Sequence, residues 1–105
     1  MRVLDFIATG QTLARAPACD FTGIVAGSRG YLRARFQFSR EWAGCKKVAV
    51  FISKGQEHPV PLELNMCEIP AEALTGRLVH VYVVGQRPGY QIATDETAFS
   101  QTVRR

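Results

Sequence analysis

The segment RFQFSREWAGCKKVAVF, residues 35–51, decides the fold. Upstream of Trp42 the sequence alternates strictly between two faces: Leu32, Ala34, Phe36 and Phe38 fall on one, and Arg33, Arg35 and Gln37 on the other. A period of two is typical of a strand with one buried face. The pattern therefore predicts a half-buried strand of an antiparallel sheet over residues 32–38.

Similar runs of strand-forming residues recur along the chain. They lie at residues 2–8, 21–27, 46–52, 58–64, 66–69, 77–84, 90–94 and 97–103. Turn residues separate them at 9–11, 27–30, 54–56 and 85–89. Residues 46–52 and 77–84 are apolar on both faces, which predicts central strands. Pro59 and Pro61 confine residues 58–64 to a sheet edge or an extended connection.

The single helical signal is IPAEALTG, residues 69–76. Pro70 suits a first helical position and Gly76 suits a C-terminal stop, but the segment is little longer than one turn. We expect it to be a crossover between the strands around Cys67 and Val79. Regularly spaced short strands with this one interruption predict a β-sandwich or a small barrel.

Length and composition indicate one globular domain, residues 1–105. Hydrophobic residues make up 47% of the 105-residue chain, enough for a real core. No apolar stretch approaches the roughly 18–20 residues of a membrane span. Asp5 interrupts the N-terminal apolar run, so residues 1–10 do not read as a signal peptide. We therefore expect a protein made in the cytosol, with no membrane partner.

The residue types of catalytic and metal sites are scattered. The three cysteines, Cys19, Cys45 and Cys67, are far apart and odd in number, which argues against a disulfide framework. With His58 and His80 they show none of the paired spacings of a structural zinc site. No carboxylate pair, nucleophile turn or phosphate-binding loop is present. The sequence therefore predicts no metal, no cofactor and no enzymatic activity.

Basic residues gather in the first half of the chain. Residues 1–56 carry nine Lys and Arg against three Asp and Glu, a formal charge of +6, whereas residues 57–105 carry −2. A candidate interaction strip contains Arg29, Arg33, Arg35 and Arg40. Interleaved aromatics such as Phe36 and Phe38 raise the alternative of an OB-like single-strand nucleic-acid groove. Because alternation puts these phenylalanines opposite the arginines, we favour a solvated or partner-facing strip.

Two interpretations compete for Trp42, the only tryptophan of the chain. It lies in the connection between two predicted strands, where it is either displayed for binding or plugs the end of the sandwich. Gly44 follows it and allows a backbone conformation that other residues resist. Since tryptophan is usually highly buried, we favour a structural plug made by Trp42 and Gly44.

The order of these motifs resembles a phage protein family. The residues are Gln11-Thr12-Leu13, VAGSRGYLRARFQFS, Trp42-x-Gly44, KKVAVF and CEIPAEAL, within residues 3–103. The family is the N-terminal β-sandwich domain of phage baseplate upper proteins, with related tail and fibre proteins of phages and prophages of Gram-positive bacteria. The shared residues are mostly of core and turn type.

The resemblance implies an immunoglobulin-like β-sandwich of about eight strands with one short helical crossover. It also implies a structural protein of the tail, baseplate or fibre attachment, which acts by self-assembly or docking and ends up in the virion. Expected partners are copies of itself or other phage structural proteins. Family members often continue into a stalk or receptor-binding part, whereas this sequence ends at Arg105, so we expect a stand-alone subunit. A carbohydrate- or receptor-binding module is a further alternative.

Overall fold

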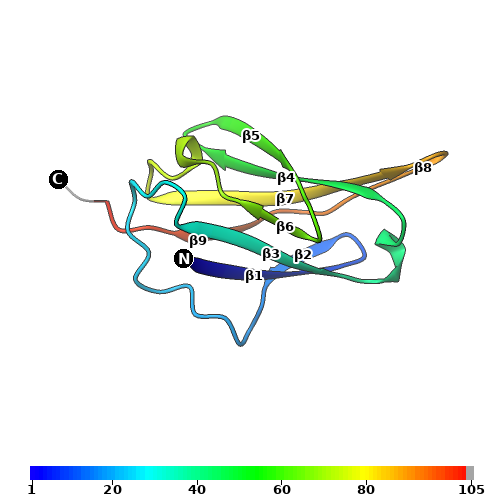
Figure 1. The fold of residues 1–105 in the computed structure, drawn as a ribbon, viewed down its shortest axis with the longest axis horizontal. Coiled ribbons are helices and arrows are strands. Elements are labelled where there is room, and N and C mark those ends of the chain that lie inside the picture. Colours follow the sequence, from blue (N-terminus) through cyan, green and yellow to red (C-terminus); the bar gives the residue numbers. More distant parts are fainter. Residues whose placement is uncertain (104–105) are drawn as a thin grey trace.

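Two β-sheets pack face to face in the computed structural model, which describes residues 1–103 (Figure 1). The first, called here the β1 sheet, has the order β2 (Thr12–Arg15), β1 (Arg2–Thr9), β3 (Leu32–Phe38) and β6 (Met66–Glu68). The second, the β4 sheet, has the order β5 (Gln56–Pro61), β4 (Lys46–Ser53), β7 (Leu78–Arg87) and β8 (Tyr90–Ala93), with β9 (Thr97–Ser100) also paired to β7. The predicted all-β sandwich is confirmed.

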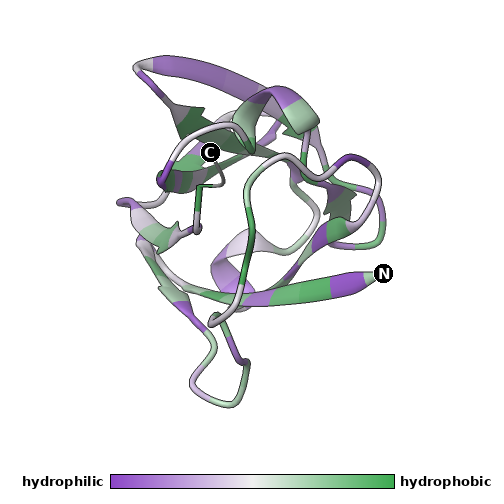
Figure 2. Cartoon of the chain, turned by 90° about the vertical axis from the view of Figure 1, so that its left-hand side faces the viewer, coloured by the Kyte–Doolittle hydropathy of each residue, from purple (hydrophilic) through white to green (hydrophobic). Residues whose placement is uncertain are grey.

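Alternation along β1 and β3 places one face of each strand in the core. Leu4, Phe6 and Ala8 of β1 are buried, as are Leu32, Ala34 and Phe36 of β3. In Figure 2, purple hydrophilic bands interrupt the green β1 ribbon where it starts at N. The expected half-buried strand at 32–38 is therefore confirmed.

The pairing of β3 differs from the expectation. It runs antiparallel to β6 but parallel to β1, with Asp5 level with Arg35. Parallel neighbours need a crossover of a dozen or more residues, which the return strand β2 and the connection 16–31 together supply. The β1–β3 pair thus departs from the all-antiparallel sheets of an immunoglobulin domain while the sandwich is kept.

The strand expected at residues 21–27 is wrong. Gly23 and Gly27 take positive φ angles of 70° and 99°, which interrupt an extended chain. Within this stretch, Val25 makes one isolated bridge, to Thr102. The Arg2 guanidinium fixes the preceding part of the loop by donating to the carbonyls of Asp20 and Thr22, at 2.9 and 2.6 Å.

The short strand β2 was not expected from the sequence. Gly10, at φ 56°, makes the tight turn that folds β2 back on β1. Leu13 is buried, and its N–H donates to the Asp95 carboxylate at 2.9 Å. Because Asp95 lies between β8 and β9, this hydrogen bond ties the edge of the β1 sheet to the β4 sheet.

The β4 sheet follows its sequence pattern closely. β4 and β7 are central strands and β5 is an edge strand, as predicted. Lys54 and Gly55 make the β4–β5 turn with φ angles of 53° and 75°, the combination of a type I′ hairpin.

Two 3₁₀ turns lie at opposite ends of the sandwich (Figure 1). η2 (Ala71–Ala73) carries the chain from β6 to β7, so the short helical crossover is confirmed in position. η1 (Arg40–Trp42) lies between β3 and β4, and it also links the two sheets. Neither turn is long and apolar enough to cross a membrane, nor is any other helix in the described residues.

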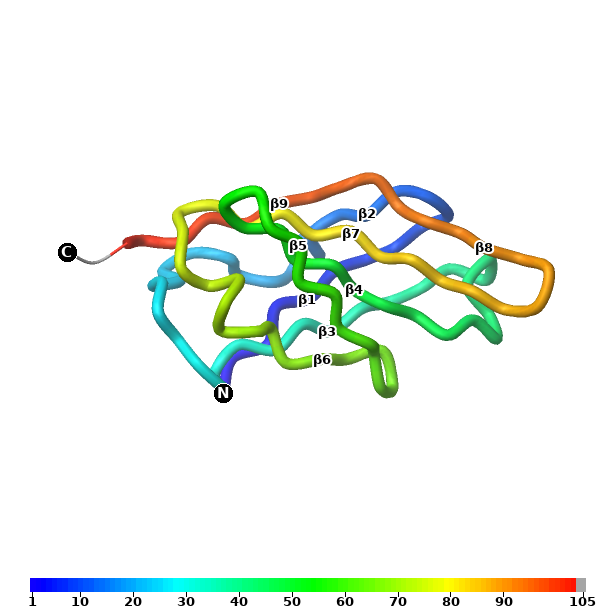
Figure 3. The backbone as a smooth tube through the Cα atoms, turned by 90° about the horizontal axis from the view of Figure 1, so that it is seen from above, coloured from blue at the N-terminus to red at the C-terminus, as the bar shows by residue number. Residues whose placement is uncertain are grey.

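The two outer faces of the sandwich differ in character. Asp5, Arg33, Arg35 and Gln37 project from the outer face of the β1 sheet, together with the partly buried Val3 and Ile7. On the β4 sheet the residues that alternate away from the core are Val48, Val50, Ile52, His80, Tyr82 and Val84. Seen from above, β5, β4 and β7 of this sheet lie side by side (Figure 3).

Candidate functional site

Trp42 is fully buried where η1 joins the two sheets. Its indole Nε1–H donates to the Gly10 carbonyl at 2.9 Å, on the β1–β2 turn. Its ring is centred 5.0 Å from that of Phe38. The side chain therefore satisfies its one polar group inside the fold and leaves no surface for a ligand.

Trp42 rests on a glycine that was expected in a turn. Gly85 was assigned to the turn 85–89, but it lies inside β7, which continues to Arg87. A Cβ on Gly85 would meet two Trp42 ring carbons, Cε3 and Cζ3, at 2.7 Å each. Position 85 continues the inward series Val79, Val81 and Val83, and a glycine there indicates close approach by another group.

Gly44 acts on the backbone and does not touch the indole. Its φ angle is 74°, and nothing lies within 4 Å of the position a Cβ would take. The next residue, Cys45, donates its N–H to the Trp42 carbonyl at 3.2 Å. Gly44 therefore turns the chain from η1 into β4, while Gly85 makes room for the ring.

The connection before Trp42 is fixed by hydrogen bonds. The Gly10 N–H donates to the Ser39 hydroxyl oxygen at 2.8 Å. Ser39 in turn hydrogen-bonds the Glu41 carboxylate, and this bond lowers the pKa of Glu41. The Tyr90 hydroxyl donates to the Glu41 carbonyl at 2.8 Å. The β1–β2 turn, the β3–β4 connection and the start of β8 are thus joined around Trp42.

The four arginines of the candidate strip are not gathered at one place. Arg33 and Arg35 lie on β3, Arg29 lies in the loop before it, and Arg40 lies in η1 beyond its other end. Arg35 is paired with Asp5, with 2.6 Å between Nε and Oδ1, and this contact raises the pKa of Arg35. The four arginines are therefore spread along the length of β3, and the charge of Arg35 is balanced by Asp5.

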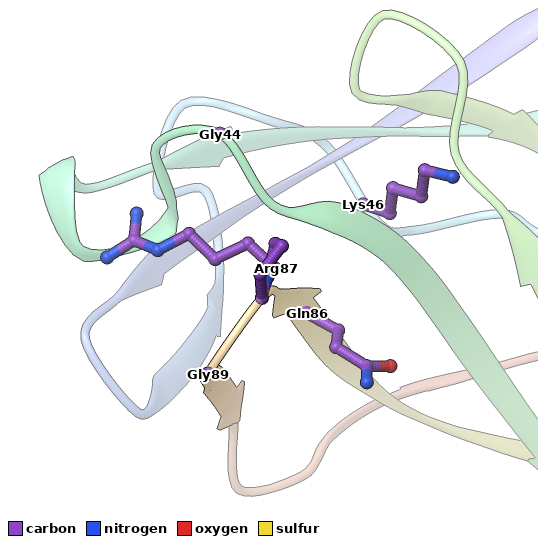
Figure 4. A pocket seen from close by; sticks show the side chains of 6 residues that line it. Gly44, Lys46, Gln86, Arg87 and Gly89 are labelled. Atoms are coloured by element: carbon purple, nitrogen blue, oxygen red, sulfur yellow. The ribbon is translucent and has the colours of Figure 1, made fainter.

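A hollow beside the β7–β8 turn carries two basic side chains. Its volume is about 540 Å³ and Lys46, Gln86 and Arg87 contribute to its wall. The Arg87 guanidinium stacks 4.0 Å from the centre of the Tyr90 ring and donates to the Ala43 carbonyl. Figure 4 shows Arg87 extending in a different direction from Lys46 and Gln86, so their polar groups do not converge on one ligand position.

The cysteines and histidines do not form a reactive cluster in the described residues. Burial raises the pKa of the Cys67 thiol to about 12, which keeps it protonated and poorly nucleophilic at neutral pH. His80 lies on the outer face of the β4 sheet, where its Nδ1 is 3.4 Å from Oε1 of Glu96. Residues 1–103 contain no group of three His, Cys, Asp or Glu that could hold a metal ion.

The sequence matches no model of a known protein family and no curated protein.

Proposed function

We propose that this chain is a non-catalytic structural subunit of a phage or prophage particle, at the tail, the baseplate or the attachment of a fibre. It works by docking onto copies of itself or onto other structural proteins of the particle. The support combines the resemblance of its motifs to the baseplate family with the way those motifs pack together.

The observation that carries the proposal is the packing of residues 36–44, FQFSREWAG, together with the lysine-led strand β4 that follows. Phe36, Phe38 and Trp42 form a continuous aromatic row, with ring centres 5.9 and 5.0 Å apart. The Lys47 ammonium lies 4.8 Å from the centre of the Phe38 ring. The motif residues therefore act as one packing unit, as expected of residues that define a shared fold.

The distribution of chemical groups agrees with a role without catalysis. The motif residues form part of the core and of turns. The most buried thiol, that of Cys67, has a raised pKa. The basic side chains around the hollow at Lys46 and Arg87 point apart. An acid, a base and a nucleophile held within mutual reach would be needed for an active site.

Nucleic-acid binding remains the competing proposal, and the geometry gives it less support. Phe36 is buried and Phe38 packs against the core, so neither ring is available for stacking on bases. Tyr31, 49% exposed, is the largest aromatic surface near the arginines. Single-strand binders combine a basic groove with several stacking rings, and β3 offers only the charge.

The direct test is the protein content of particles. Prophage would be induced in the bacterium that carries this gene, and particles would be purified on a density gradient. We expect the chain in the particles, with immunogold label at one end of the tail. Particles that contain the other tail proteins and lack this chain would refute the proposal.

A genetic test uses the packing unit itself. Deletion of the gene should give particles with incomplete tails, which the wild-type gene restores. The Trp42→Ala variant should fail to restore them because it disrupts the fold, whereas the surface variant Gln37→Arg should succeed.

A further inference from the structure

The outer face of the β4 sheet is apolar although no other part of the core covers it. Val48, Ile52 and Val84 lie on this face, remain partly exposed and are outside the core cluster. Antiparallel sheets with a solvated face usually carry polar residues on that face. Here the centre of the face is valine, isoleucine, tyrosine and proline.

Cross-strand register places these residues in rows across the sheet. The central rows run Pro59–Val50–Tyr82 and Pro61–Val48–Val84–Ala93. These two rows give an apolar surface in which Val50 is itself buried, and the Tyr82 hydroxyl at its margin donates to the Glu57 carboxylate at 3.4 Å.

Charges of opposite sign lie at the two ends of this surface. Toward the end of β4, Ile52 lies between Glu57 and His80, and His80 is paired with Glu96. At the start of β4, Lys46 lies level with Gln86. The face is therefore acidic at one end, apolar in the middle and basic at the other end.

We propose that a second copy of this chain docks on the outer face of the β4 sheet, as a face-to-face dimer with a twofold axis. An axis midway between the two facing sheets, parallel to them and perpendicular to the strands, superposes the apolar rows of the two copies. The same rotation brings Lys46 of each copy to the acidic end of the other, next to Glu57, whose carboxylate also accepts from the Tyr82 hydroxyl of its own copy. Twofold contacts need a surface that is complementary to itself, and this arrangement of rows meets that condition.

The dimensions of the face match a weak, specific dimer. The sheet is four strands wide and β4 is eight residues long. Strands about 4.8 Å apart with a rise of about 3.4 Å per residue give roughly 500 Å² of flat area on each copy. A total of about 1,000 Å² lies at the lower limit for a specific interface, so we expect a weak, concentration-dependent dimer. Stacked sheets keep their strands within about 30° of each other, as this superposition requires.

Edge-to-edge association through β5 is disfavoured by the same structure. Pro59 and Pro61 lie on the edge strand and lack the N–H groups that a further strand would need. The β5 edge is therefore a poor site for pairing with a second copy.

The first measurement is the mass of the full chain in solution. Light scattering and sedimentation from micromolar to millimolar concentration should show a monomer that becomes a dimer. A monomer throughout this range would overturn the proposal. If such a monomer were still incorporated into particles, with Val84→Arg excluded from them, the face would dock a different chain.

Matched charge variants locate the interface. Val84→Arg places a charge in the apolar centre of the dimer and should raise the Kd more than about 100-fold. Gln37→Arg adds the same charge to the outer face of the β1 sheet and should leave the Kd unchanged. Trp42 fluorescence checks that both variants are folded. Equal effects of the two substitutions, or no effect of Val84→Arg, would overturn the proposal.

A charge swap tests the orientation of the two copies. Lys46 and Glu57 lie near opposite ends of one face, on the order of 20 Å apart by the rise per residue, too far to pair within one copy. Lys46→Glu and Glu57→Lys should each raise the Kd about tenfold, and the double swap should restore it. A double variant weaker than either single one would exclude this orientation.

The inference deepens the proposed function and rests on it only for the expectation that the chain self-assembles. The experiments can refute the dimer and the virion role independently of each other. Absence from particles with an intact concentration-dependent dimer would refute the virion role and leave the interface standing.

Discussion

The two sheets of this protein are alike inside and differ outside. The inner face of the β1 sheet is mainly leucine, phenylalanine and alanine, and that of the β4 sheet is mainly valine, phenylalanine and alanine. The outer face of the β1 sheet carries the Asp5–Arg35 ion pair beside Val3 and Ile7. The outer face of the β4 sheet carries valines. A strand that is apolar on both sides is therefore central in its sheet, but its own chain need not cover both of its faces.

The largest effect should come from breaking the contact that joins the two sheets. Trp42→Ala should lower the free energy of unfolding by about 3–5 kcal/mol, the range for truncating a buried large aromatic. Urea unfolding followed by far-UV circular dichroism measures it. In the wild-type protein the Trp42 emission should be blue-shifted and poorly quenched by iodide.

A graded control is Trp42→Phe. It keeps an aromatic ring against Phe38 and loses the hydrogen bond to the Gly10 carbonyl, so its loss should be smaller. A red, freely quenched wild-type emission together with a neutral Trp42→Ala variant would contradict the buried position and favour a displayed tryptophan.

A second large effect is expected in the dependence of stability on pH, because the Cys67 thiol is buried under the β1 sheet. Folding raises the pKa of Cys67 from 9.0 to about 12. Between these values the unfolded chain has lost a proton that the folded chain keeps, so stability is full below pH 9 and falls as the pH rises. The loss by pH 12 should reach up to about 4 kcal/mol.

Comparison with variants isolates this thiol from other groups that titrate at high pH. Cys67→Ala should have a shallower decline of stability with pH than the wild-type protein. Rapid reaction of native Cys67 with iodoacetamide at neutral pH would show that the thiol is accessible and contradict the prediction.

The close approach of Trp42 to β7 predicts a moderate effect at Gly85. Gly85→Ala puts a methyl group where the indole ring lies and should cost about 1–3 kcal/mol, the usual range for overpacking. Combined with Trp42→Phe, whose ring is smaller, the substitution should cost less than it does alone. Additive losses in this double-mutant cycle would mean that the two side chains do not share the space.

A small effect is expected from the ion pair on the outer face of the β1 sheet. Asp5→Asn and Arg35→Gln remove the charges of an exposed pair, whose strength is reduced by solvent and salt. Both variants should stay close to wild-type stability, with any difference vanishing at high salt. A large loss of stability that persists at high salt would show that this face is organised more tightly than a solvated one.

The smallest effect should be on nucleic-acid binding. Oligonucleotide affinity at physiological salt should be no better than non-specific, roughly 10⁻⁴–10⁻⁶ M. Replacing Arg33 and Arg35 by alanine should change it little beyond the loss of charge. Submicromolar binding that weakens steeply in this variant and with salt would reverse the ranking of the two proposals.

Much of the secondary structure could be predicted because it depends on local patterns. The period of two marked β1 and β3, the Lys54-Gly55 turn marked a hairpin, and two prolines marked β5 as an edge. The strand expected at 21–27 failed because its glycines take positive φ angles. β2 was missed because its four residues are held by the turn at Gly10 and by Asp95, far along the chain.

The candidate site was only partly accessible to sequence reasoning. Trp42 was singled out by its rarity and its position, but its partner was assigned to Gly44, its neighbour in the chain. The residue that makes room for the ring is Gly85, 43 positions away. The arginine strip was defined by proximity in sequence, and the structure distributes its members over a loop, a strand and a turn.

The sequence by itself determined the all-β class, the inward faces of the long strands and the crossover near residue 71, because these follow from alternation and turn chemistry between near neighbours. Only the tertiary structure decided the parallel pairing of β1 with β3, the contact of Trp42 with Gly85 and the exposure of the second apolar face of the β4 sheet. The physical reason is that alternation fixes which residues share a face, whereas the partner of that face is set by long-range packing between segments that the local pattern does not relate.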